Sequence, residues 1–174
     1  MNLERWKWDL LESGPAGAGH TVLLLPAGLC TAVFYEELMA EPKLAGVRLV
    51  AATLPGHGGS PAPDDVSIEN YARLTCELAA DVGCDAVVGH SFGATVALEM
   101  AASGGFSGPL VLLAPSFSRE GEAKFFRALD RLSRVLAHLP YVAMLKLIPG
   151  EVKARPLSPD RRDVLVVELQ KNDP

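Results

Sequence analysis

The sequence lacks any long uninterrupted run of apolar residues. Its apolar segments, such as residues 22–25, have the length of β-strands and fall well short of the roughly 18 residues that a membrane-spanning helix needs. Charged residues interrupt the apolar ones within the first nine positions, so no signal-peptide core is present there. We therefore expect a cytoplasmic protein that does not cross a membrane.

Cysteine is also scarce. The sequence has three, Cys30, Cys76 and Cys84, with no Cys-x-x-Cys pair and no histidine cluster beside them. An odd number without paired spacing argues against a disulfide framework and against a zinc site. We expect reduced, mostly buried thiols and no bound metal.

Blocks of like charge are missing as well. The formal net charge is −5, and the basic residues are scattered along the chain. Such a chain offers no basic patch to neutralise a phosphate backbone, so neither nucleic acid nor an anionic membrane surface is an expected partner. The composition, 49% apolar and 21% charged over 174 residues, is instead that of one globular domain or an incomplete one.

Strand patterns and helix patterns alternate through the first two thirds of the chain. Trp6, Trp8 and Leu10 alternate with polar residues, which is typical of a half-buried edge strand near residues 4–11. Unbroken apolar runs predict buried strands, and apolar residues at three- and four-residue steps predict helices. The expected strands cover residues 21–25, 47–52, 85–89 and 110–114, and the expected helices cover residues 34–44, 67–82 and 95–102. This order predicts an α/β fold with a parallel sheet and right-handed crossovers.

The pattern changes after Pro115. Apolar positions at helical spacing predict helices over residues 125–139, 140–148 and 158–170, with no further strand. We therefore expect a partial α/β core over residues 1–116 and a helical region over residues 117–174.

Residues 89–93 read Gly-His-Ser-Phe-Gly and fit the pattern G-x-S-x-G at a predicted strand-to-helix junction. In that context the pattern is typical of a strained turn that raises the serine hydroxyl above the carboxyl edge of the sheet. Side chains two residues before and after the serine would collide in such a turn, so both positions require glycine or another small residue. The amides at the start of the following helix can stabilise negative charge on a substrate oxygen.

Three segments together resemble the α/β-hydrolase fold superfamily. They are residues 23–28 (Leu-Leu-Leu-Pro-Ala-Gly), residues 54–60 (Leu-Pro-Gly-His-Gly-Gly-Ser) and the serine motif, and they occur in that superfamily's order and at its spacing. The resemblance implies that Ser91 is the catalytic nucleophile. It implies that the backbone amides of Phe92 and Gly28 form the oxyanion hole, with Leu29 as the adjacent possibility for the second donor. It implies a small-molecule acyl substrate, no metal, no organic cofactor, and that residues 117–174 begin a cap.

The chain departs from the superfamily after Ser91. The fold carries its acid and then its histidine after later strands, but the only later histidine is His138, which is predicted on a polar helix face. His57 is expected to order its loop. His90 is expected to be part of the turn formed by residues 89–93, called the serine turn below. We therefore expect a chain truncated at its C-terminus before the acid and the base, with little activity of its own.

Two other functions stay open on the sequence alone. A protein that keeps the substrate pocket and cap of this fold but lacks the catalytic acid and base would suit a non-catalytic role in binding a small molecule or a protein partner. A thioesterase or acyltransferase is the other alternative, because the pattern Gly-His-Ser-x-Gly occurs in those enzymes too. The sequence does not predict an oligomeric state.

Overall fold

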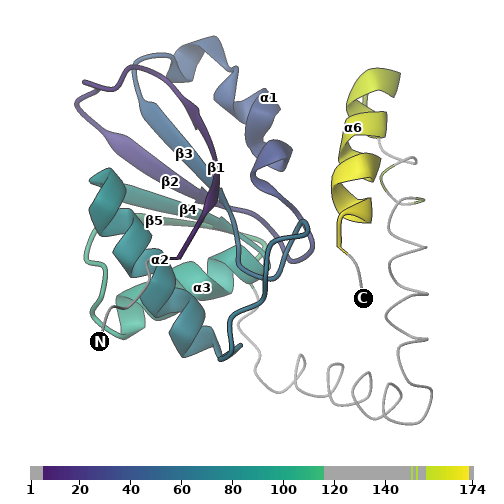
Figure 1. The fold of residues 1–174 in the computed structure, drawn as a ribbon. Helices are drawn as coiled ribbons and strands as arrows, with labels where there is room; N and C mark the ends of the chain where they lie inside the picture. The colour runs from purple at the N-terminus through teal and green to yellow at the C-terminus, as the bar shows by residue number, and fades with distance from the viewer. Residues whose placement is uncertain (1–5, 116–149, 151, 153–155, 173–174) are drawn as a thin grey trace, which may run out of the picture. The chain divides into compact units, whose positions relative to one another are not determined.

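The computed structural model describes residues 6–115, 150, 152 and 156–172. Contacts divide the chain into two compact units, Met1–Pro115 and Ser116–Pro174. The first unit holds the sheet, and the second holds helix α6 (Pro159–Gln170) (Figure 1). The assignment of residues 117–174 to a cap stays a prediction.

The first unit is built on one five-stranded sheet in the order β1-β3-β2-β4-β5. The strands are β1 (Asp9–Ser13), β2 (Thr21–Leu25), β3 (Arg48–Thr53), β4 (Ala86–His90) and β5 (Leu110–Leu113). Neighbouring strands are parallel except at the edge, where β1 runs antiparallel to β3. The predicted α/β fold with a mostly parallel sheet is therefore confirmed.

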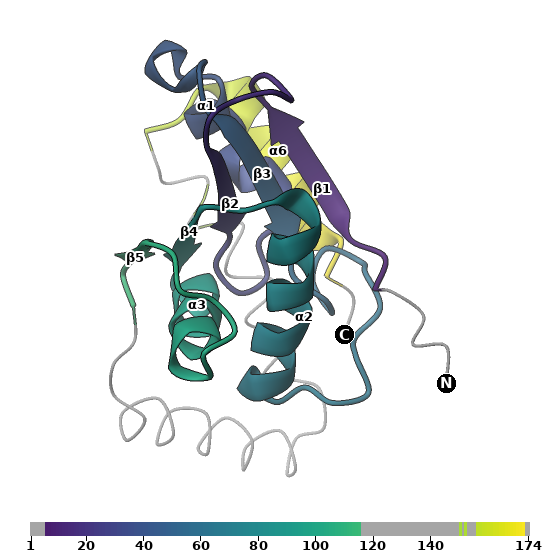
Figure 2. The ribbon, with the colours of Figure 1, turned by 90° about the vertical axis from the view of Figure 1, so that its left-hand side faces the viewer.

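Apolar side chains cover both faces of the sheet. Alternate residues of β2 point to opposite faces, so Leu23 and Leu25 belong to one buried cluster and Leu24 to the other. The first cluster lies under helices α2 (Ile68–Val82) and α3 (Phe92–Ala102), which Figure 2 shows in front of the sheet. The second lies under the short helices η1 (Ala32–Tyr35) and α1 (Glu36–Met39).

The crossover helix α2 has clear start and stop signals. The hydroxyl of Ser67 accepts a hydrogen bond from the amide of Asn70, and Gly83 ends the helix with φ of 66°, in the left-handed region. These caps fix the length of the connection between β3 and β4. The predicted helix over residues 67–82 is confirmed to within one residue.

Three predicted boundaries were wrong. The edge strand begins at Asp9, which pairs with Thr53 at the end of β3, so residues 6–8 are not part of it, and residues 4 and 5 lie outside the described residues. The predicted helix over residues 34–44 is three short pieces, η1, α1 and η2 (Pro42–Leu44), because Glu41 is extended before proline. Helix α3 begins at Phe92 rather than at residue 95.

In the second unit, helix α6 (Pro159–Gln170) matches the prediction for residues 158–170, and the hydroxyl of Ser158 caps it by accepting from the amide of Arg161. The predicted helices over residues 125–139 and 140–148 lie outside the described residues. None of the helices in the described parts is long and apolar enough to cross a membrane.

Candidate active site

The candidate site lies where the order of strands reverses. From β2 the chain goes to β3 on one side, and α2 then carries it back to β4 on the other side of β2. In open α/β sheets, ligands bind outside the carboxyl ends of the strands at such a reversal. The loop after β2 carries Gly28 and the turn after β4 carries Ser91, so the topology brings these two predicted site residues to one place.

Ser91 occupies a sharp turn between β4 and α3. Its backbone has φ of 51° and ψ of −112°, which non-glycine residues seldom adopt and which costs on the order of 1–3 kcal/mol. Its amide donates to the carbonyl oxygen of Leu113 on β5 at 2.9 Å, which holds the turn against the neighbouring strand. The residue is exposed, so its hydroxyl is open to a reactant.

The two glycines of the motif are required by close backbone contacts. A Cβ atom on Gly89 would lie 2.4 Å from the carbonyl oxygen of Gly93, and a Cβ atom on Gly93 would lie 2.3 Å from the carbonyl oxygen of Leu25. The amide of Gly93 also donates to the carbonyl oxygen of Pro26 at 3.1 Å. The start of α3 therefore packs directly on the end of β2.

The amides of Gly28 and Phe92, the predicted oxyanion donors, lie on adjacent loops. A Cβ atom on Gly28 would lie 3.7 Å from Cβ of Phe92. Neither amide has a hydrogen-bond acceptor among the described residues. Phe92 opens an 11-residue helix, whose N-terminal dipole favours negative charge at this point. Leu29, the alternative donor, has φ of 66°, so the loop after β2 is strained too.

His57 and Tyr71 enclose the ring of Phe92. The imidazole stacks on it with ring centroids 5.6 Å apart, and Tyr71 meets it edge-on at 5.3 Å. Both residues also hydrogen-bond the same carbonyl oxygen, that of Pro55, through Nδ1 of His57 at 2.9 Å and the hydroxyl of Tyr71 at 3.0 Å. Burial lowers the pKa of His57 below its usual range, which favours the neutral ring.

Sequence reasoning missed Tyr71 altogether. Its place on the apolar face of α2 marks it as a core residue, and no linear pattern shows that its hydroxyl reaches back to Pro55. A similar contact orders the loop after β2, where the hydroxyl of Tyr35 donates to the carbonyl oxygen of Leu25 at 2.9 Å. Both tyrosines support backbone that carries predicted site residues.

Within the described ranges, no hydrogen bond joins Ser91 to a histidine. His90 is exposed at the end of β4, and His138 lies outside the described residues. No group of three histidine, cysteine, aspartate or glutamate side chains in those ranges is placed to hold a metal ion. The thiol of Cys30, near Gly28, is half-buried, and this burial raises its pKa to about 12 and keeps it protonated.

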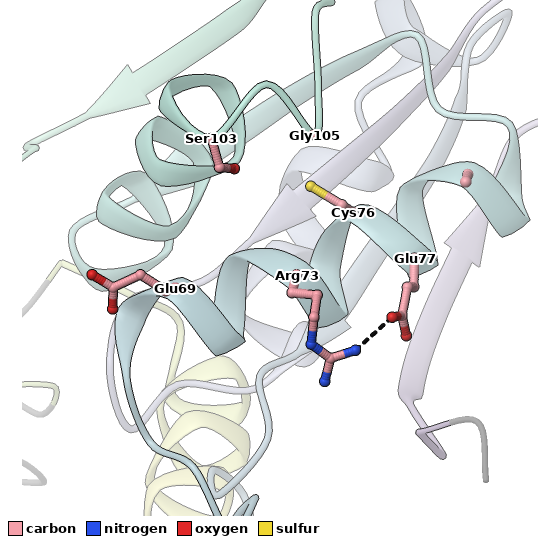
Figure 3. A pocket seen from close by; sticks show the side chains of 7 residues that line it. Glu69, Arg73, Cys76, Glu77, Ser103 and Gly105 are labelled. Carbon is pink, nitrogen blue, oxygen red and sulfur yellow. Dashed lines mark hydrogen bonds and ion pairs between the residues drawn. The ribbon is translucent and has the colours of Figure 1, made fainter. Parts of the chain in front are cut away.

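A shallow pocket lies elsewhere, between α2 and the C-terminal end of α3 (Figure 3). Arg73 and Glu77, which pair with each other, and Cys76 line it from α2, and Ser103 lines it from α3. Ser91 precedes the opposite end of α3. This pocket is therefore separate from the candidate site.

Comparison with protein families gives one match, to the model described as the alpha/beta hydrolase family, over residues 17–170. The chain belongs to this family. No protein of curated function matches the sequence. The match covers strands β2 to β5, the serine turn and α6, so the resemblance expected from the three sequence motifs is confirmed.

Solved structures share the fold at low sequence identity. The chain is similar to the thioesterase domain from the curacin biosynthetic pathway (TM-score 0.64, 19% identity, 91% of this chain and 62% of that one). It is similar to an α/β hydrolase fold protein from Burkholderia ambifaria (TM-score 0.68, 23% identity, 94% of this chain and 63% of that one). It is also similar to an esterase from Rhodococcus sp. ECU1013 (TM-score 0.67, 20% identity, 93% of this chain and 64% of that one). The chain thus spans less than two thirds of the length of each.

Proposed function

We propose that this family member is a serine hydrolase that acts on an ester or a related acyl compound, with Ser91 as the nucleophile. The observation that carries the proposal is the backbone of Ser91, which is held at a positive φ between two glycines that admit no side chain. Strain of this kind persists only where the surrounding structure enforces it, and it is concentrated at functional sites.

The proposed reaction follows from the groups around that turn. The Ser91 oxygen attacks the acyl carbon and loses its proton to a base, and the carbonyl oxygen becomes an oxyanion. The amides of Gly28 and Phe92 donate to this oxyanion, which is favourable because both lack an acceptor among the described residues. The alcohol then leaves with a proton, and water cleaves the acyl-enzyme to give the acid and free Ser91.

The base is the part of this mechanism that the described residues do not provide, because none of their histidines is hydrogen-bonded to Ser91. We propose that the 174-residue chain has only feeble activity. Oxyanion stabilisation and binding alone leave roughly 10³- to 10⁴-fold acceleration over water when the triad residues are absent. His138, the one later histidine, is proposed to have no part in it.

Hydrolysis of p-nitrophenyl acetate by the purified 174-residue protein tests the proposal. We expect a slow rate above background that Ser91→Ala removes and that His138→Ala leaves unchanged. Ser107→Ala is the matched control, since Ser107 is an exposed serine before β5. A rate that survives Ser91→Ala would refute the nucleophile. A fast rate that His138→Ala abolishes would make His138 the base.

A further inference from the structure

The hydrogen bond at Nδ1 fixes the chemical state of the His57 ring. Its partner, the carbonyl oxygen of Pro55, can only accept, so the proton must be on Nδ1. In the neutral form of the ring, which burial favours by lowering the pKa of His57, the other nitrogen, Nε2, has no proton and presents a lone pair. The stacking on Phe92 holds the ring in this orientation.

The nitrogen Nε2 of His57 lies beside the loop that carries Gly28. Nε2 of His57 would lie 4.0 Å from a Cβ atom on Gly28, so it borders the space beside the Gly28 backbone. The side-chain hydrogen bond that the described residues give His57 is at Nδ1, and the residue is half-buried. A possible acceptor, held by the bond at Nδ1, therefore lies next to the Gly28 backbone.

We propose that Nε2 of His57 accepts a hydrogen bond from a hydroxyl or N–H group on the acyl part of the substrate, next to the reacting carbonyl. The inference rests on the proposed function, which puts the carbonyl oxygen between the amides of Gly28 and Phe92. The proposal places a donor on the adjacent carbon at the Gly28 side of the site, next to His57. The preferred substrates are thus esters of 2-hydroxy or 2-amido acids rather than of plain fatty acids.

The rigidity of the ring is what makes this contact selective. The carbonyl of Pro55 also accepts from Tyr71, which belongs to a different element, α2, so the anchor of the ring is itself held in place. A pre-oriented acceptor loses little conformational entropy when it binds a donor. A substrate without the donor leaves Nε2 unsatisfied when it covers the site, which disfavours that substrate.

An NMR experiment tests the inference without relying on catalysis. Long-range ¹H–¹⁵N spectra of the 174-residue protein at pH 8 should show His57 protonated at Nδ1, and hydroxyacetone should shift its Nε2 resonance much more than acetone does. These ketones imitate the acyl group with and without the donor. A ring protonated at Nε2, or equal responses to the two ketones, would overturn the inference.

Hydrolysis provides the second measurement. Relative to their uncatalysed rates, we expect phenyl glycolate to be hydrolysed roughly 3- to 10-fold faster than phenyl acetate, the range of one neutral hydrogen bond. His57→Phe keeps a stacking ring but should bring this ratio to about one, whereas His57→Gln, which retains an acceptor, should keep part of it. A ratio that His57→Phe leaves intact would refute the inference. If Ser91→Ala does not slow hydrolysis, the proposed function fails, and the ketone titration alone decides about His57.

Discussion

Replacing Gly93 by alanine tests whether the serine turn is as tightly packed as the structure shows it. The new Cβ atom would lie 2.3 Å from the carbonyl oxygen of Leu25 and 2.6 Å from that of Pro26. Both atoms are backbone, so neither can turn aside as a side chain would. Overpacking of this kind costs about 1–3 kcal/mol, and contact with two backbone oxygens puts this case near 3 kcal/mol.

Helix propensity acts in the opposite direction, so the two readings of the structure predict changes in stability of opposite sign. In a helix, alanine is favoured over glycine by about 1 kcal/mol, so without the clash Gly93→Ala would stabilise α3. The expected net loss is about 2 kcal/mol, which for a chain of this size lowers Tm by about 4–8 °C. Thermal and urea unfolding followed by circular dichroism measure both quantities.

Gly46→Ala serves as the matched control, because a Cβ atom there meets nothing within 4 Å and its φ lies outside the left-handed region. It should unfold at nearly the temperature of the parent protein. If Gly93→Ala were as stable as this control, or more stable than the parent, α3 would not pack on the end of β2 as described.

Further predictions concern single side chains near the site. Iodoacetamide at pH 8 should leave Cys30 unlabelled in the folded protein and label it in urea, because burial raises its pKa to about 12, and peptide mass spectrometry reports the difference. NMR titration should give His57 a pKa below 6.5. Since the folded state then binds its proton less readily than the unfolded chain, stability should fall as the pH drops below about 6.5, and His57→Gln should reduce that fall in urea midpoints. Tyr71→Phe should cost about 1 kcal/mol in urea unfolding, since it removes the hydrogen bond to Pro55; no loss would contradict that bond.

The features that could be predicted from the sequence are those determined by residues close together along the chain. Helix α2 shows a regular apolar spacing and a serine cap, and both are read from neighbouring residues. The motif around Ser91 likewise combines a strand, a small-residue turn and a helix within a short segment. Its location at a strand-to-helix turn could therefore be predicted before the fold was known.

What sequence could not supply depends on residues that are distant along the chain. The start of β1 is set by Thr53, 44 residues away, whose hydroxyl donates to Asp9. The tautomer of His57 is set by the Pro55 carbonyl, and Tyr71 shares that carbonyl from the next helix. Periodicity predicts which face of a helix or strand is buried, but it does not predict which atoms are in contact across the core.

The backbone amides of the serine turn are of two kinds, which should differ in their rate of hydrogen exchange with solvent. Those of Ser91 and Gly93 donate to the carbonyls of Leu113 and Pro26, so they can exchange with deuterium only when α3 and the turn leave the sheet. The amide of Phe92, between them, has no acceptor among the described residues. We therefore expect slower deuterium exchange at Ser91 and Gly93 than at Phe92, and a molecule that binds the Phe92 amide should protect that amide most.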